Sequence, residues 1–189
     1  MTHYVLILAG GRGNRLNKTI PKQFLYLDGI PLLMHSVKSF YDADPKSKIY
    51  IGLSDEHIPE WSSVCKKHQF TIPHQIYSGG DERIDTVFEG LKKLKKLELN
   101  PHDIVSIHDA ARPFIDKKFI LELMGHVTTH DVVIPIFPIK NSIRKLNSNS
   151  LNRQSQVVDR SQYQQVQTPQ LFNLYKLINC YEKIYLNSS

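Results

Sequence analysis

Cysteine is scarce in this sequence: Cys65 and Cys180 are the only two among 189 residues. Their positions show neither paired spacing nor a metal-binding motif. A framework of disulfides or a zinc site built on cysteines is therefore not expected, and the composition favours a reducing compartment.

Long apolar runs are also missing. No segment approaches the roughly 20 consecutive apolar residues that a membrane-spanning helix needs. The first predicted strand begins at Tyr4, which leaves no room for a signal peptide ahead of it. We therefore expect a cytoplasmic protein with no membrane partner.

Two familiar phosphate-binding motifs are absent as well. No Gly-Lys-Ser/Thr triplet closes the glycine-rich segment near the N-terminus, which excludes a Walker loop. A dinucleotide fingerprint fits poorly. It would need a glycine where Leu16 stands and an acidic residue at a strand end at the expected distance, and the sequence has neither.

The residues that are present suit one globular domain spanning 1–189. Apolar residues make up 41% of the chain and charged residues 22%, and the length is short for two domains. A formal net charge of +6 favours a partner that carries phosphate. The lysines of 92–96 interleave with the apolar face of a predicted helix and have no aromatic platform beside them, so we expect no nucleic-acid partner.

Predicted strands alternate with predicted helices through most of the chain. This order favours an α/β fold with a mainly parallel, twisted sheet that has helices on both faces. In such sheets ligands bind beyond the carboxyl ends of the strands. The predicted strands are Tyr4–Leu8, Lys48–Leu53, Ile72–Tyr77, Ile104–His108 and Val132–Phe137, and the predicted helices are Pro31–Tyr41, Pro59–His68, Arg83–Leu97, Lys117–Thr128 and Leu174–Leu186.

Residues 140–167 interrupt the alternation. They are polar, and the segment Asn147–Ser150 separates two alternating stretches, Ser142–Leu146 and Gln156–Arg160. This pattern predicts a protruding β-hairpin arm. Because two strands alone are marginally stable in water, we expect the arm to pack on something else, such as a second subunit.

The most informative segment follows the first predicted strand and reads Ala9-Gly10-Gly11-Arg12-Gly13-Asn14-Arg15, with Pro21-Lys22-Gln23 shortly after it. Its glycines let backbone amides approach a ligand and form an anion-binding nest. Its arginines and Lys22 add positive charge, so the segment predicts a polyphosphate site. The alternative is an ordinary strand-to-helix turn with surface arginines.

Two further clusters lie at predicted strand ends. In Gly79-Gly80-Asp81-Glu82-Arg83, glycines precede a helix whose first turn carries Arg83 and Thr86, although a plain helix start with acidic residues has the same pattern. In His108-Asp109-Ala110-Ala111-Arg112-Pro113, the carboxylate could hold a divalent cation and the arginine a phosphate. The alternative for that pair is a local ion pair.

A third cluster, Arg160 with Thr168-Pro169-Gln170, follows the arm. An arginine and a hydroxyl there would suit a phosphorylated acceptor, although Thr-Pro is also a common helix start.

In this order and spacing, the clusters resemble the family of 2-C-methyl-D-erythritol 4-phosphate cytidylyltransferases. The resemblance covers nearly the whole chain. It implies a Rossmann-like nucleotidyltransferase fold, CTP as a substrate, Mg²⁺ as a cofactor and a homodimer formed through the arm.

The resemblance also implies roles for individual residues. The family usually has serine where Thr86 stands and threonine where Ser142 stands, and Arg160 would reach the partner subunit's site. The implied roles are catalysis for Arg15 and Lys22, CTP binding for Ala9, Gly10, Gly11, Arg12, Gly13, Gly80, Asp81, Arg83 and Thr86, acceptor binding for Arg112, Ser142, Arg160 and Thr168, and metal binding for Asp109.

The chemistry of such a transfer agrees with these residue types. A phosphate monoester is already an anionic nucleophile near neutral pH, so no general base is required. The protein has to bring two anions together and stabilise charge on the reacting phosphorus and the departing pyrophosphate. Arginine, lysine, loop amides and Mg²⁺ serve that purpose.

Members of the family continue for a few dozen residues past the position of Ser189, with an acidic pair and a lysine-bearing strand. We therefore expect the C-terminal part of the family's domain to lie outside this chain. Two alternatives remain at this point: a ribitol 5-phosphate cytidylyltransferase that supplies wall or capsule polymers, and a non-catalytic relic that still binds nucleotide. Val158-Asp159-Arg160 and Val166-Gln167-Thr168-Pro169-Gln170 resemble the erythritol group more closely than the ribitol group.

Overall fold

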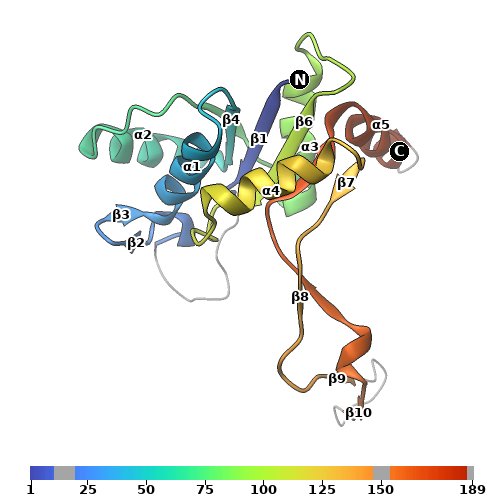
Figure 1. The fold of residues 1–189 in the computed structure, drawn as a ribbon. Coiled ribbons are helices and arrows are strands. Elements are labelled where there is room, and N and C mark those ends of the chain that lie inside the picture. The colour runs from blue at the N-terminus through green and yellow to red at the C-terminus, as the bar shows by residue number, and fades with distance from the viewer. Residues whose placement is uncertain (11–19, 147–153, 187–189) are drawn as a thin grey trace.

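A six-stranded sheet with the order β5-β4-β1-β6-β12-β7 forms the centre of the computed structural model, which describes residues 1–10, 20–146 and 154–186 (Figure 1). Strand β1 pairs in parallel with β4 and β6, and β4 pairs in parallel with β5. Strand β12 is antiparallel to both β6 and β7. The strands are β1 (His3–Leu8), β4 (Lys48–Leu53), β5 (Gln75–Ser78), β6 (Ile104–Asp109), β7 (Val132–Val133) and β12 (Gln170–Asn173).

Strand β1 shows why the sheet is covered on both faces. All six of its residues are buried, as expected for a central parallel strand. Val5 and Ile7 belong to one apolar cluster, and Tyr4, Leu6 and Leu8 belong to another. Successive side chains of a strand point to opposite faces, so the two clusters are the two sides of the sheet.

The helices divide between these two faces (Figure 1). Helices α1 (Leu32–Ala43), α2 (Ile58–Lys67) and α4 (Lys117–Val127) contribute residues to the cluster of Val5 and Ile7. Helices α3 (Arg83–Lys95) and α5 (Leu174–Leu186) contribute to the other cluster. The predicted α/β fold with a mainly parallel sheet is confirmed. No helix in residues 1–10, 20–146 and 154–186 is long and apolar enough to cross a membrane.

The polar segment forms an arm that extends away from the sheet (Figure 1). Strand β8 (Ile136–Pro138) pairs with β11 (Gln164–Val166), and β9 (Arg144–Leu146) pairs with β10 (Ser155–Val157), both antiparallel. Paired strands therefore begin before residue 140. The second predicted arm strand ends early, because the Asp159 side chain accepts a bond from the backbone N–H of Ser161 and starts the 3₁₀ turn η3 (Arg160–Gln162).

Two other expected strands are corrected by the structure. The predicted strand Val132–Phe137 is divided between β7 in the central sheet and β8 in the arm, with Pro135 between them, because proline has no N–H for a ladder. The strand expected at Ile72–Tyr77 begins only at Gln75, after Pro73.

Four short elements lie between β1 and α2 in the chain. The 3₁₀ turn η1 (Lys22–Phe24) precedes a hairpin of β2 (Tyr26–Leu27) and β3 (Ile30–Pro31), and η2 (Asp55–His57) follows β4. Asp28 and Gly29 connect the hairpin strands with φ of 48° and 80°. Two positive φ angles match a tight hairpin turn, for which Asp-Gly is a favoured pair.

Candidate functional site

The carboxyl ends of the parallel strands meet at one edge of the sheet. Leu8 is in register with Gly52 of β4 and with Asp109 of β6. The pairing continues one residue beyond the strands, because the N–H of Ala9 donates to Gly52 O (2.8 Å) and the N–H of Ala110 donates to Leu8 O (3.0 Å). The glycine-rich segment after β1 and the loop after β6 therefore begin side by side.

Glycine allows the loops after β1 and β5 to approach helix α3 closely. A Cβ on Gly10 would lie 3.3 Å from Thr86 Oγ1, and one on Gly79 would lie 3.1 Å from the same atom. A Cβ on Gly80 would lie 2.2 Å from the Asp85 Cβ. A Cβ at Gly10 or Gly79 would thus make a tight contact, whereas one at Gly80 would force the start of α3 to shift.

Thr86 organises this meeting point. Its side chain is buried, and its Oγ1 accepts a bond from the Gly80 N–H (3.2 Å) and lies within donating distance of the carbonyl oxygens of Gly80 (3.3 Å) and Glu82 (3.1 Å). Glu82 and Asp85 form a capping box at the same helix start. The hydroxyl predicted to bind CTP therefore also holds the loop that carries Gly80 and Asp81.

Asp109, the predicted metal ligand, is held between two arginines. Arg83 Nε donates to Asp109 Oδ1 and Arg112 Nε donates to Oδ2, each at 3.0 Å. The carboxylate is 29% exposed and the arginines are 48% and 41% exposed. The Asp109–Arg112 ion pair considered from the sequence is present. Together with Arg83 it forms one cluster of residues expected to bind CTP, metal and acceptor.

The loop after β6 is tied to the segment by which the arm returns to the sheet. Arg112 Nη1 donates to Gln167 Oε1. Thr168 Oγ1 accepts from the Asp109 N–H (3.3 Å) and bonds to His108 Nδ1 (3.0 Å). Of the predicted acceptor residues, the structure thus brings Arg112 and Thr168 together.

His108 belongs to the same hydrogen-bond network. Its side chain is fully buried, and its Nε2 lies 3.1 Å from Arg112 O. Burial, which disfavours the charged imidazolium, lowers the pKa of His108 to about 4. The ring is therefore neutral at physiological pH.

Lys22 and Gln23 lie in η1 and have different surroundings. Gln23 is buried, and its Nε2 donates to Ala9 O at 2.6 Å. Lys22 is only partly buried. Gln23 thus fixes its neighbour Lys22 to the point where the chain leaves β1, a role that the sequence analysis did not assign although Gln23 was part of a motif.

A groove opens beside Arg112, between the loop after β6 and the base of the arm. Its wall is largely apolar and includes Phe114, Phe119 and Phe137, and Thr168 contributes to it. Phe114 is 88% exposed.

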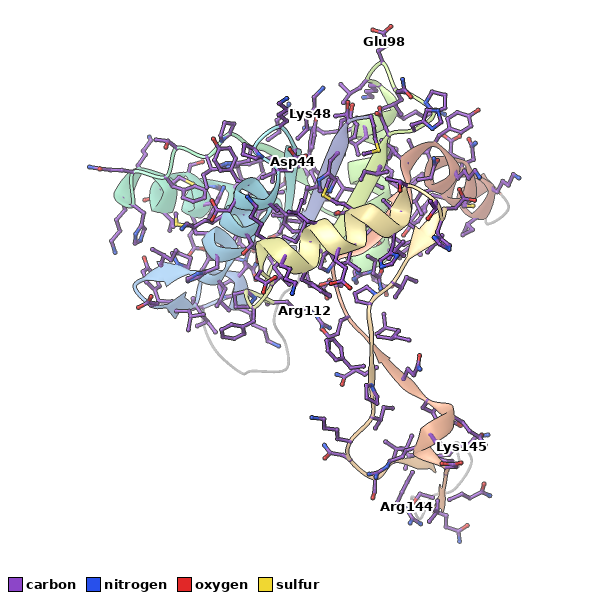
Figure 2. The ribbon with its side chains drawn as sticks, viewed as in Figure 1. Asp44, Lys48, Glu98, Arg112, Arg144 and Lys145 are labelled. Atoms are coloured by element: carbon purple, nitrogen blue, oxygen red, sulfur yellow. The ribbon has the colours of Figure 1, made fainter. Side chains whose placement is uncertain are left out.

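The other two predicted acceptor residues lie elsewhere. Ser142 stands between β8 and β9, and Arg160 begins η3, where its Nη1 donates to Lys140 O. Both stand in the segment between β8 and β11, which extends away from the body that carries Arg112 (Figures 1 and 2). The structure does not bring them to Asp109 within one chain.

Some predicted residues cannot be placed. Gly11, Arg12, Gly13 and Arg15 lie outside the described residues. In the described ranges no group of three or more His, Cys, Asp or Glu side chains could hold a metal ion.

Comparisons with known proteins identify the family of this chain. Residues 3–188 match the family model described as "IspD: 2-C-methyl-D-erythritol 4-phosphate cytidylyltransferase". A protein of that name from Azobacteroides pseudotrichonymphae is 39% identical over 95% of this chain and 77% of its own length. One from Bacteroides fragilis is 34% identical over 97% of this chain and 80% of its own length.

Solved structures share the fold. 4-Diphosphocytidyl-2C-methyl-D-erythritol synthase from Anaerococcus prevotii superimposes with a TM-score of 0.76 at 19% identity, over 98% of this chain and 75% of that one. 2-C-Methyl-D-erythritol 4-phosphate cytidylyltransferase from Thermus thermophilus gives 0.75 at 21% identity, over 100% of this chain and 79% of that one.

Proposed function

Because this chain belongs to the IspD family of 2-C-methyl-D-erythritol 4-phosphate cytidylyltransferases, we infer that the edge of its sheet transfers CMP from CTP to that polyol phosphate and releases pyrophosphate. The family shows the type of enzyme and its place in isoprenoid precursor synthesis. The assignment of individual residues below is our proposal.

One observation supports the assignment of the site: Asp109 is contacted by Arg83 from the start of α3 and by Arg112 from the loop after β6. A transfer between two phosphorylated substrates needs positive charge on both sides of the reacting phosphorus. Arg83 supports binding of CTP together with Gly10, Gly80, Asp81 and Thr86. Arg112 supports binding of the acceptor phosphate, which arginine can grip with two parallel bonds.

Among the described residues, Asp109 is the carboxylate that we propose for Mg²⁺. Magnesium keeps most of its waters and binds through one or two carboxylates together with substrate phosphate oxygens. Both oxygens of Asp109 now accept bonds from arginines, and the phosphates of two substrates would compete for those arginines. When bound, the ion would neutralise phosphate charge.

Lys22 and Arg15 are proposed to stabilise the charge that develops at the reacting phosphate. Lys22 stands in η1, which Gln23 fixes to Ala9 O at the end of β1. A cation carried on an anchored backbone segment needs less reorganisation as charge develops. The acceptor phosphate itself attacks, and the chain needs no general base.

We propose that two chains assemble through their arms, so that Ser142 and Arg160 of one chain complete the acceptor site of the other. The arm exposes apolar side chains that a second copy could cover: Phe137, Leu146, Val157, Tyr163 and Val166 are each between 45% and 77% exposed. Light scattering coupled to gel filtration tests this, and a monomer at micromolar concentration would contradict it.

The decisive experiment measures pyrophosphate release from CTP with each polyol phosphate in turn. We expect turnover with 2-C-methyl-D-erythritol 4-phosphate and Mg²⁺, and little with ribitol 5-phosphate. A preference for ribitol 5-phosphate would overturn the proposed acceptor. Binding of CTP without turnover of either acceptor would indicate a nucleotide-binding relic.

We also propose that the reaction takes place in the cytoplasm. Both cysteines, Cys65 and Cys180, are free thiols, which suits a reducing compartment.

A further inference from the structure

His108 lies at the junction of three segments without reaching the surface. It is the penultimate residue of β6, its side chain is 0% exposed, and its ring packs edge-on against Phe40 with centroids 5.4 Å apart. A buried ring of this kind cannot touch a substrate. Any part it has in the reaction must act through its neighbours.

The two ring nitrogens of His108 have different partners. The partner of Nε2 shows which nitrogen carries the proton. Arg112 O is a carbonyl oxygen and can only accept, so His108 Nε2, 3.1 Å away, carries the hydrogen. The ring is 0% exposed and its nitrogens are bonded to a carbonyl oxygen and a hydroxyl, so burial favours the uncharged form, in which the other nitrogen, Nδ1, is an acceptor. Thr168 Oγ1, 3.0 Å from Nδ1, therefore directs its hydrogen to His108.

The same reasoning fixes what the Thr168 hydroxyl can offer a ligand. A hydroxyl has one hydrogen and two lone pairs. The hydrogen is committed to His108, and one lone pair accepts from the Asp109 N–H at 3.3 Å. What remains is a single lone pair, which can accept a bond from a hydroxyl group but cannot donate one to a phosphate oxygen.

We propose that His108 is a positioning residue of the acceptor site, which holds the Arg112 loop with one ring nitrogen and orients the Thr168 hydroxyl with the other. The proposal rests on the proposed function in one respect, that Arg112 and Thr168 line the site for the polyol phosphate. It assigns Arg112 to the phosphate of the acceptor and the Thr168 lone pair to one of its hydroxyl groups.

Three substitutions separate the two contacts. In His108→Asn, an amide oxygen can take the place of Nδ1 and keep the bond to Thr168, but nothing reaches Arg112 O. In His108→Gln, an amide N–H can take the place of Nε2 and keep the bond to Arg112 O. His108→Phe keeps the ring packing on Phe40 and loses both bonds.

The measurement compares KM for 2-C-methyl-D-erythritol 4-phosphate with KM for CTP. For His108→Phe we expect the acceptor KM to rise at least tenfold and the CTP KM to change less than twofold, with smaller acceptor effects for the two amide variants. His102→Gln, on the exposed loop before β6, is the matched control and should change neither. An unchanged acceptor KM, or an equal rise in both KM values, would overturn the proposal.

A double-mutant cycle identifies the contact. Thr168→Val removes the hydroxyl that His108→Gln leaves unpartnered, so the acceptor KM of the double variant should match that of Thr168→Val alone. Independent, multiplying effects of the two changes would contradict the assigned bond.

A last readout does not depend on turnover. The ¹⁵N resonances of His108 should show a protonated Nε2 and an unprotonated, hydrogen-bonded Nδ1, and Thr168→Val should shift the Nδ1 signal. A proton on Nδ1 would refute the positioning proposal even in an active enzyme. The predicted tautomer without turnover of the polyol phosphate would instead refute the proposed function alone.

Discussion

Arg83 Nε lies 3.0 Å from Asp109 Oδ1, although the two residues are 26 positions apart in the chain. Arg83 is the first residue of α3 and Asp109 is the last of β6, so the contact joins a helix start to a strand end. It brings a residue expected to bind CTP against one expected to bind metal, at the edge of the sheet where parallel strands place ligands.

Asp109→Asn should abolish most of the turnover and leave the fold intact. The change removes the carboxylate proposed to bind Mg²⁺, and we expect pyrophosphate release to fall at least about 100-fold. Because exposed ion pairs contribute about 0–1 kcal/mol each, the free energy of unfolding should change by no more than about 2 kcal/mol. Glu98→Gln, far from Arg112 in Figure 2, is the control. Turnover within twofold of the unchanged protein would exclude Asp109 as the metal ligand.

Lys22 and Gln23 are neighbours, but replacing Lys22 should lower turnover, whereas replacing Gln23 should lower stability. Lys22→Ala should lower kcat about 100-fold at nearly constant stability, because a partly exposed cation adds little to folding. Gln23→Leu should lower the free energy of unfolding by about 1–3 kcal/mol, since it leaves the Ala9 carbonyl without its buried partner. Urea unfolding and steady-state kinetics on the same samples separate the two effects. Equal stability loss in both variants would contradict this division.

Thr86 tests whether a hydroxyl at the start of α3 is needed to shape the CTP site. Thr86→Val is close in volume but removes every bond that Oγ1 makes to Gly80 and Glu82. We expect KM for CTP to rise about tenfold and stability to fall by about 1–3 kcal/mol. Thr86→Ser retains the hydroxyl and should stay within threefold of the unchanged KM. If valine is tolerated as well as serine, the loop does not depend on this hydroxyl.

A pair of glycine substitutions tests the close approach of the loop after β5. Gly80→Ala would place a Cβ 2.2 Å from the Asp85 Cβ, so the start of α3 has to shift, at a cost of about 1–3 kcal/mol and with weaker CTP binding. Gly125→Ala, inside α4 with nothing within 4 Å of the added atom, should instead stabilise the protein by up to about 1 kcal/mol. Thermal unfolding and CTP titration give both results. Normal CTP affinity in Gly80→Ala would show that the approach is not needed for binding.

The stability of the protein should depend on pH through His108. Its pKa is lowered to about 4 in the folded protein, from about 6.5 in the unfolded chain, because burial disfavours the charged ring. The unfolded state therefore binds a proton first as pH falls. The stabilisation is complete above pH 6.5 and decreases by about 3 kcal/mol in total as pH falls from 7 to 4.

Denaturant unfolding at several pH values measures this dependence, and His108→Gln provides the reference. The variant cannot titrate at this position, so its stability should decline less steeply between pH 7 and 4. Parallel curves for the two proteins would show that His108 is not the group responsible.

Local sequence patterns determined most of the architecture. The apolar run of β1, the Asp28-Gly29 turn and the amphipathic pattern of α3 each indicate one structure, because backbone geometry and burial of one helix face act over a few residues. The glycine-rich segments likewise indicated close backbone approach before any neighbour was known. The arm was visible as a polar interruption, although its strands begin earlier than expected.

Tertiary structure alone decided which of these segments meet. Nothing near Gln170 in the sequence says that β12 inserts between β6 and β7, since strand pairing depends on partners more than 30 positions away. The burial of His108, its two partners and the anchoring of Ala9 by Gln23 likewise arise only when the strand ends are assembled. Residue types and their spacing thus identified the chemistry, whereas long-range packing set the geometry that brings Arg83, Asp109 and Arg112 into contact.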